Sequence, residues 1–310
     1  MKKKKFWKIF GITILVLVAA GGVYAFTVYR SVRDMMNEAH IDLDRETIRD
    51  EELVLGERDE DGNIIPFSVL LLGIDRDHPN DRGRSDSMML VTVNPNEGST
   101  NVLSIQRDSR VAIPGRGTTR INHAYAYGGP ALAIETVENF LNVPIDYFVT
   151  IDMDGIQALV DAVGGITVYN DTIAFSQDGH HFSRGDNTLN GSAALAFSRN
   201  RSDTDFGRMA RQRLVLDALI SRLASTAVTR FQPIMDAVGA NMTTDLLMDD
   251  IITMSTTYLP AMPPLGEINM TDLQGHGGIA DNGMWLLSVP EYNRLEATNR
   301  MREHLGLELE

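Results

Sequence analysis

The stretch Phe67-Ser-Val-Leu-Leu-Leu-Gly-Ile74 is a short apolar run that ends at a charged residue, Asp75. A run of this length and composition is typical of a strand that is buried on both faces. Two more apolar strands are expected over residues 87–93 and 101–105. An aspartate lies at or beside one end of each of these three predicted strands: Asp75, Asp86 and Asp108.

Helices and strands alternate after the third predicted strand. Periodic apolar residues predict helices over 130–141 and 153–163 and strands over 147–151 and 166–169. This alternation indicates an α/β sandwich with a sheet that is at least partly parallel. Ligands bind at the carboxyl ends of the strands in such sheets, which is where Asp75, Arg107 and Asp108 are expected.

The amino-terminal region predicts a membrane anchor. A basic tail over residues 1–5 precedes an apolar segment over residues 6–26. About twenty apolar residues span a bilayer as a helix, and lysines before the span place the amino terminus in the cytoplasm. We therefore expect a single-pass cell-membrane protein with the rest of the chain outside the cell. A cleaved signal peptide is the alternative, because Ala19, Ala20 and Ala25 supply the small residues of a cleavage site.

Residues 27–66 are polar and rich in aspartate and glutamate. Like charges keep such a segment extended and repel an anionic membrane surface. We expect it to begin as a helix and to continue as an acidic juxtamembrane linker.

The composition excludes several classes of protein. The chain has no cysteine, which excludes disulfides, thiol nucleophiles and thiolate metal sites. Lysine occurs only within the first eight residues, which excludes a phosphate-loop lysine or a Schiff-base lysine in the body of the protein. A net charge of −14 argues against a nucleic-acid partner, because nucleic-acid-binding domains present a basic surface.

Arginines are concentrated between residues 199 and 213 of this acidic chain. Arg199 and Arg201 share a face on an extended chain, and Asp205 is expected to cap a helix on which Arg208 and Arg211 are neighbours. Cations are unfavourable at the positive end of a helix, whereas a phosphate suits both the helix dipole and a guanidinium group. The segment therefore predicts an anion site, and a solvated, salt-bridged helix end is the alternative.

Carboxylates are expected close to these arginines. Asp75 and Asp86 bracket a predicted polar loop over residues 76–85, and Asp108 and Asp205 are nearby if the strand ends converge. Mg²⁺ takes one or two carboxylates and fills its shell with phosphate oxygens and waters. Ion pairs with arginine are the alternative for each aspartate taken singly. The arginines outnumber these aspartates, which points to an added anion; they are Arg84, Arg107, Arg120, Arg199, Arg201, Arg208 and Arg211.

Several motifs, in order along residues 67–223, closely resemble the LytR-CpsA-Psr family. They are Leu71-Leu-Gly-Ile-Asp75, Arg84-Ser-Asp86, Ser104-Ile-Gln-Arg107-Asp108, Arg120-Ile-Asn-His-Ala-Tyr, Arg199-Asn-Arg201 and Asp205-Phe-Gly-Arg208-Met-Ala-Arg211-Gln212. The sequence departs from the usual family pattern at Gln106, where proline is common, at Phe197, where tyrosine is frequent, and at Arg120, which replaces a common lysine.

The resemblance implies an α/β/α sandwich around a mixed, partly parallel central sheet, preceded by one N-terminal transmembrane helix. Residues 67–310 would form an extracytoplasmic catalytic domain with a hydrophobic pocket for a lipid tail. The implied activity is a phosphotransferase that uses Mg²⁺, with Mn²⁺ as the alternative ion. It would move a glycopolymer, such as teichoic acid or capsular polysaccharide, from a polyprenyl-pyrophosphate carrier to a peptidoglycan sugar hydroxyl in cell wall assembly.

The resemblance also assigns site residues. Asp75 and Asp86 match the metal-binding carboxylates. Arg107 is a catalytic residue, and Asp86 or Asp108 is expected to accept the proton of the attacking hydroxyl. The positions that match the pyrophosphate-binding set are Arg84, Arg107, Arg120, Arg199, Arg201, Arg208, Arg211 and Gln212.

Two other functions remain open on the sequence. One is a pyrophosphatase that acts on the same lipid with water as the acceptor. The other is a non-enzymatic, membrane-anchored regulator that binds anions. The regulator needs the arginines but not the metal-binding carboxylates, so loss of function in Asp75→Asn would count against it.

Overall fold

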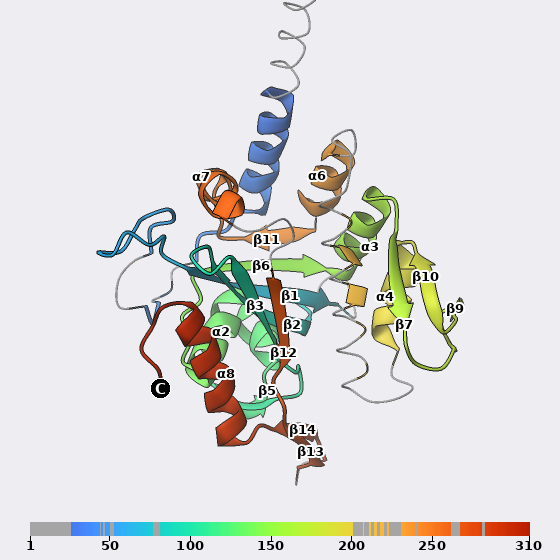
Figure 1. Ribbon diagram of the computed structural model, residues 1–310. Coiled ribbons are helices and arrows are strands. Elements are labelled where there is room, and N and C mark those ends of the chain that lie inside the picture. Colours follow the sequence, from blue (N-terminus) through green and yellow to red (C-terminus); the bar gives the residue numbers. More distant parts are fainter. Residues whose placement is uncertain are drawn as a thin grey trace, which may run out of the picture.

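A six-stranded sheet lies at the centre of the protein (Figure 1). Its strands are β1 (Phe67–Asp75), β2 (Arg84–Asn94), β3 (Ser99–Ser104), β6 (Tyr147–Asp152), β11 (Met242–Thr244) and β12 (Glu267–Asp272), in the order β11-β6-β1-β2-β3-β12. β1 pairs in parallel with β6, and β3 in parallel with β12, while the other pairs are antiparallel. The predicted α/β class with a mixed, partly parallel sheet is confirmed.

The computed structural model describes residues 26–43, 45, 47–49, 53–76, 81–200, 207, 211, 214–215, 218–219, 222, 231–239, 241–261, 267–280 and 283–310. Nearly all of the predicted membrane span over residues 6–26 and most of the arginine segment after residue 200 lie outside these residues. Within the described part of the chain, no helix has the length and apolar character needed to cross a membrane.

Helices cover both faces of the sheet (Figure 1). On one face, Leu70 and Leu72 of β1 join a core with α2 (His123–Leu141) and α8 (Glu291–His304). On the other face, Phe67 packs against Tyr258 of η2 (Met254–Tyr258), which follows α7 (Met248–Thr253). Successive strand residues point to opposite faces, so burial on both faces explains the unbroken apolar run of β1. Each fully buried leucine contributes about 2 kcal/mol.

β2 begins earlier than the sequence predicts. The expected strand covers residues 87–93, after a loop that includes Arg84, but the pairing of β1 with β2 extends to Asp75 opposite Arg84. Arg84 and Asp86 are therefore strand residues. Apolar periodicity does not mark these polar positions, because they lie at the end of the sheet and not over its core.

α2 begins well before Pro130, the predicted start of that helix. The helix is broken at Gly129 (φ 69°, ψ −156°), and Pro130 opens its second part. Glycine is nearly alone in adopting this backbone conformation, and proline is favoured in a first helical turn. The first part of α2 follows directly on β5 (Gly117–Arg120), which pairs with β4 (Arg110–Ile113).

A smaller lobe packs beside the sheet around the rings of Phe175, Phe182 and Phe197, whose centroids lie 5.0–5.6 Å apart. Asn190 caps α4 (Gly191–Arg199) by accepting a hydrogen bond from the Ala193 N–H at 2.9 Å. The elements of this lobe are α3 (Met153–Ala162), β7 (Ile166–Asn170), β8 (Phe175–Gln177), β9 (His180–Phe182), β10 (Gly185–Leu189), α4 (Gly191–Arg199) and α6 (Phe231–Gly239).

The segment that precedes β1 is partly packed against the domain. Residues 26–39 form a helix, and Met36 and Ala39 within it are buried. His40 then pairs with Thr244 of β11, so the chain lies along that edge of the sheet. The expected linker over residues 27–66 thus contains residues with fixed contacts to the sheet.

Candidate functional site

The carboxyl ends of the parallel strands meet at one edge of the sheet. Asp152 at the end of β6 pairs with Ile74 of β1, and Ser104 at the end of β3 pairs with Asp272 of β12. β2 runs between β1 and β3 in the opposite direction, so its first residues lie at the same edge. Asp75, Asp86, Arg107 and Asp108 are therefore attached to neighbouring strand ends, as their spacing predicts.

Arg107 lies between two carboxylates. Its Nη1 donates to Asp86 Oδ2, and its Nε donates to Asp108 Oδ2 at 3.4 Å. The side chains of Arg107, Asp86 and Asp108 are 14%, 18% and 7% exposed. Water is largely excluded from these contacts, so the attraction between the charges is stronger than in a surface ion pair.

Arg120 joins the same cluster from the end of β5. Its Nε lies 3.1 Å from Asp108 Oδ1 and donates to the Trp285 carbonyl oxygen at 3.0 Å. Trp285 begins β14 (Trp285–Ser288), which pairs with β13 (His276–Ile279). Asp108 thus faces two arginines, one on each carboxylate oxygen. We call Asp86, Arg107, Asp108 and Arg120 the strand-end cluster.

Asp75 is paired with Arg199 at the end of α4. The Arg199 Nη2 donates to Asp75 Oδ1 at 2.9 Å, and the two side chains are 40% and 36% exposed. The smaller lobe therefore delivers an arginine to the carboxyl end of β1, although the two residues are far apart in the sequence. Arg84 lies directly opposite Asp75 in the β1–β2 pairing.

The described residues place Arg211 in the smaller lobe. Its Nη2 donates to the Asn200 carbonyl oxygen at 2.6 Å, and its guanidinium lies over the Phe175 ring, 5.5 Å from the centroid. Arg211 is buried there, in contact with the residue that follows α4 and with the aromatic core of the smaller lobe. Arg201, Arg208 and Gln212, the other predicted pyrophosphate ligands of this segment, lie outside the described residues.

Two residues of the site were not assigned a role from the sequence. Asn122 Nδ2 donates to Asp86 Oδ1 at 3.0 Å. His123 Nδ1 lies 3.0 Å from Thr119 Oγ1, and burial together with the positive charges of Arg120 and Arg84 lowers the pKa of His123. Both residues lie within three positions of Arg120 in one motif, Arg120-Ile-Asn-His123, and that proximity is the signal that could have identified them.

Oxygen ligands for a divalent cation are available, but they are few. Asp75 and Asp86 lie at the same edge of the sheet, and the described residues contain no group of three or more histidine or acidic side chains arranged to hold a metal. Two carboxylates fit Mg²⁺, which completes its shell with waters and phosphate oxygens. The donor chemistry therefore fits an ion that binds together with a phosphorylated ligand.

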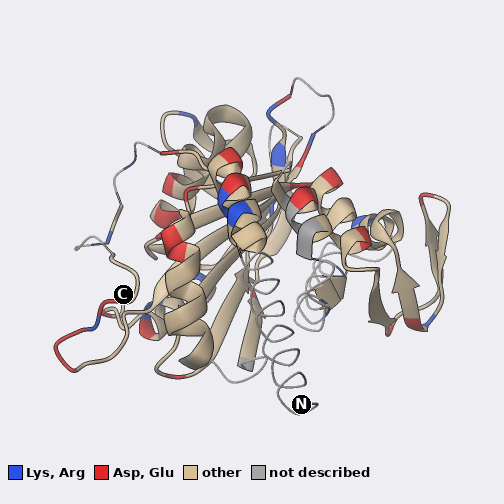
Figure 2. Cartoon of the chain, turned by 90° about the horizontal axis from the view of Figure 1, so that it is seen from above, with Lys and Arg blue, Asp and Glu red and all other residues tan. Residues whose placement is uncertain are grey.

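The surroundings of the site are acidic. Figure 2 shows Asp and Glu residues spread over the described helices around the sheet, in keeping with the net charge of −14. The strand-end cluster, in which two arginines face two aspartates, is thus a place without net negative charge in an acidic molecule. An anion is repelled by the acidic surface elsewhere, but at this point it can contact arginine side chains.

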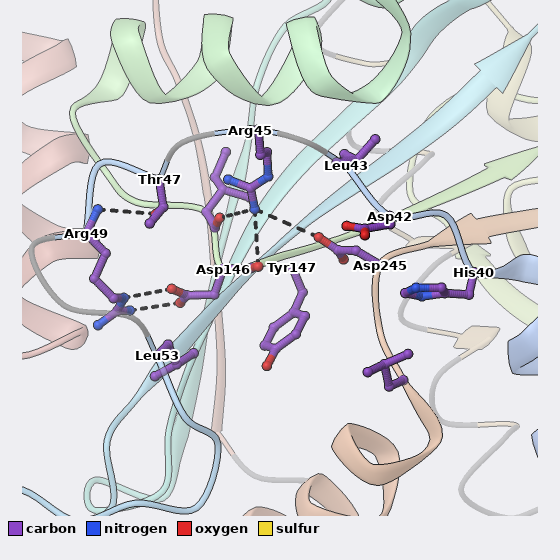
Figure 3. Close-up of a pocket in the computed structure, with 12 residues that line it drawn as sticks. His40, Asp42, Leu43, Arg45, Thr47, Arg49, Leu53, Asp146, Tyr147 and Asp245 are labelled. Atoms are coloured by element: carbon purple, nitrogen blue, oxygen red, sulfur yellow. Dashed lines mark hydrogen bonds and ion pairs between the residues drawn. The ribbon is translucent and has the colours of Figure 1, made fainter.

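A separate cavity of about 410 Å³ lies at the opposite end of the sheet, where β1 and β6 begin (Figure 3). Arg49 binds both carboxylate oxygens of Asp146 there, at 2.7 and 2.8 Å. Arg45 Nη2 donates to the Ile145 carbonyl oxygen at 2.7 Å and lies 3.8 Å from Asp245 Oδ2. The lining mixes charged side chains with apolar ones such as Leu43 and Leu53, which differs from the hydrophobic lipid pocket that the family resemblance implies. This cavity is where the segment before β1 is attached to the sheet.

Comparison with known proteins gives consistent results. The sequence model of the LytR_cpsA_psr family matches residues 27–303. A protein of Bacillus anthracis named polyisoprenyl-teichoic acid–peptidoglycan teichoic acid transferase TagU is 41% identical over 312 residues, covering 98% of this chain and 99% of the relative.

The similar solved structures include proteins of the same kind as the sequence relatives. The crystal structure of Bacillus subtilis TagU has a TM-score of 0.61 and 36% identity, covering 79% of this chain and 99% of that one. A structure of TagT bound to LIIa-WTA has a TM-score of 0.70 and 30% identity, covering 86% of this chain and 100% of that one.

Proposed function

Because the chain belongs to the LytR-CpsA-Psr family, we propose that it is a transferase that moves teichoic acid from a polyisoprenyl carrier to peptidoglycan. The observation that carries the proposal is the strand-end cluster, in which Arg107 and Arg120 are held beside Asp86 and Asp108 where parallel strands end. Similarity to a named transferase over nearly the whole chain supports the same conclusion.

The substrate head group is a pyrophosphate that links the lipid to the polymer. Guanidinium groups bind phosphate oxygens through paired hydrogen bonds, which suits Arg107 and Arg120 and their neighbours Arg84 and Arg199. The carboxylates that face these arginines fix the guanidinium orientations before the ligand arrives. Asp75 and Asp86 would hold Mg²⁺, which supplies positive charge to the phosphate oxygens.

The transfer is an in-line displacement at the phosphorus that carries the polymer. A peptidoglycan hydroxyl oxygen forms the new bond to this phosphorus, and the bond to the bridging oxygen breaks, so the lipid leaves as its monophosphate. Asp86 or Asp108 accepts the hydroxyl proton. Arginine side chains stabilise the negative charge that develops on the leaving phosphate.

The proposed location follows from the amino-terminal sequence. Residues 6–26 form the membrane span, residues 1–5 remain in the cytoplasm, and residues 67–310 form the domain outside the cell membrane. A lipid-linked substrate and a peptidoglycan acceptor are both found at that surface. The location is tested by labelling a cysteine introduced at an exposed position, Ser176→Cys, in intact cells with a reagent that does not cross the membrane.

The activity is tested by product analysis on the full-length protein in detergent. The substrate is a polyprenyl-pyrophosphate-linked glycopolymer, supplied with Mg²⁺ and with or without peptidoglycan. We expect polymer phosphate on peptidoglycan and lipid monophosphate in solution, both dependent on the acceptor. Equal lipid release without acceptor would instead identify a pyrophosphatase, and binding without turnover would identify a regulator.

A further inference from the structure

Asn122 occupies a position where asparagine usually serves the helix that follows. It immediately precedes α2, and an asparagine at that position commonly accepts a hydrogen bond from a backbone N–H of the first turn. Here the side chain makes no such capping bond, and the backbone of Asn122 is itself helical (φ −67°, ψ −16°). The amide group therefore has another role.

The contacts of Asn122 are with the strand-end cluster. Its Nδ2 donates to Asp86 Oδ1 at 3.0 Å, while Arg107 Nη1 donates to the other oxygen of the same carboxylate. The backbone N–H of Asn122 donates to the Arg107 carbonyl oxygen at 3.2 Å. Both oxygens of Asp86 are thus held, and the carboxylate also fixes which end of the amide is the nitrogen.

This arrangement does not serve stability alone. Asn122 is 3% exposed, and its Oδ1 is buried without a hydrogen-bond partner among the described residues. A buried acceptor left unpaired destabilises the folded protein. Other buried side-chain atoms of the described residues also lack a hydrogen-bond partner. Three of them belong to residues next to cluster residues in the sequence: Ser85 Oγ, Gln106 Nε2 and Ser109 Oγ. Buried polar atoms left without a partner are often found at functional sites.

We infer that Asn122 is a positioning residue, which holds the Asp86 carboxylate in the orientation needed to bind the metal ion. The inference rests on the proposed function and adds to it a residue that does not itself bind the ion. Groups that orient a metal ligand in this way commonly change metal affinity or activity by 10–100-fold when they are removed. Loss of the amide would leave Asp86 free to turn toward Arg107.

The test compares Asn122→Ala with a buried asparagine of the smaller lobe. Asn170 is 2% exposed, donates to the Ser183 carbonyl oxygen at 3.1 Å and accepts from Thr172 Oγ1 at 2.7 Å, so its polar atoms are paired. Asn170→Ala is expected to lower the melting temperature without changing the response to Mg²⁺. Asn122→Ala is expected to lower the melting temperature less and to weaken that response.

Two readouts follow the response in the full-length protein in detergent. One is the rise in melting temperature as Mg²⁺ is added, and the other is the Mg²⁺ concentration that gives half-maximal transfer. For each readout the midpoint is the Mg²⁺ concentration that gives half of the full effect. Both midpoints are expected to rise about 10–100-fold in Asn122→Ala. Unchanged midpoints, with a wild-type protein that responds to Mg²⁺, would overturn this inference alone. A wild-type protein that transfers polymer without any Mg²⁺ response would overturn it together with the proposed metal site.

Discussion

Asp108 and Asp75 place the same chemical group in two different environments. Asp108 is 7% exposed and lies within 3.4 Å of Arg107 and 3.1 Å of Arg120, whereas Asp75 is 36% exposed and faces a half-exposed Arg199. Removing one partner of a buried ion pair leaves an uncompensated charge, while an exposed pair contributes little. The two aspartates should therefore differ in their contribution to stability.

Asp108→Asn is expected to lower the free energy of unfolding by about 2–4 kcal/mol, because it leaves Arg120 facing a neutral group and removes one of the two carboxylates beside Arg107. Asp75→Asn is the matched substitution, and its expected effect is below about 1 kcal/mol. Urea denaturation followed by circular dichroism measures both values. Equal losses of stability would show that Asp108 is as well hydrated as Asp75.

A second residue-scale prediction concerns pH. Burial raises the pKa of Asp245 from 3.8 to about 6, although its contact with the Phe148 N–H and the nearby charges of Arg45 and His40 oppose the rise. The folded protein therefore binds this proton more tightly than the unfolded chain does. The group favours folding at acidic pH, and this advantage is lost as pH rises from about 4 through about 6.

Asp245→Asn removes this titration and keeps the size of the side chain. Between pH 4 and about 6.5 we expect the unfolding free energy to fall in the wild type and to fall less in the variant. The difference between the two falls is expected to reach up to about 3 kcal/mol. Chemical denaturation at a series of pH values gives the comparison. Parallel curves for the two proteins would mean that Asp245 keeps its ordinary pKa in the folded protein.

At the scale of elements, the apolar strands and amphipathic helices could be predicted from sequence. β1, β3 and β6 lie close to their expected ranges because each is a run of mostly apolar residues; β1 and β3 are buried on both faces, whereas β6 is buried on one face and partly buried on the other. β8, β9 and β12 were not predicted, since they are short or polar and give no clear periodicity. The pairing of β12 with β3 joins residues far apart in the chain, and local sequence carries no signal for it.

The candidate site was predictable to a similar extent. The rule that ligands bind at strand carboxyl ends brought Asp75, Arg107 and Asp108 to one edge of the sheet. The pairing of each arginine with a particular carboxylate was not predictable, because it depends on the β1–β2 register and on where α4 ends. Asn122 was overlooked because the helix that follows it was expected to begin only at Pro130, and an asparagine in a predicted loop gives no signal of its own.

The attachment of the segment before β1 gives an element-scale prediction. The Asp146 side chain is 3% exposed and accepts hydrogen bonds from Arg49 and from the Ser68 N–H at 2.8 Å. Arg49→Ala leaves this carboxylate without its cation and is expected to cost about 2–4 kcal/mol. Amide hydrogen exchange is expected to increase in residues 40–49 and to stay unchanged around the strand-end cluster.

The control for this prediction is Arg30→Ala. Arg30 pairs with Asp34 on the amino-terminal helix, with side chains 71% and 62% exposed, so its removal should change stability by less than about 1 kcal/mol. Increased exchange in residues 40–49 of the control as well would show that the segment is not held by Arg49.

At the scale of the whole molecule, one end of the sheet holds the strand-end cluster and the other holds the anchored segment. β6 connects the two regions, because Asp146 precedes its first residue and Asp152 is its last. The arrangement separates the proposed chemistry from the attachment of the amino-terminal helix. Substitutions at Arg49 should therefore change stability without changing transfer by properly folded protein.

The central claim is that the strand-end cluster transfers a lipid-linked polymer to peptidoglycan. Its most direct test is the rate at which labelled polymer becomes attached to peptidoglycan, measured for wild type, Arg107→Ala and the exposed control Arg58→Ala, with folding checked by circular dichroism. We predict that Arg107→Ala loses at least about 100-fold in rate, whereas Arg58→Ala matches wild type. A folded Arg107→Ala protein that transfers polymer at the wild-type rate would contradict the account.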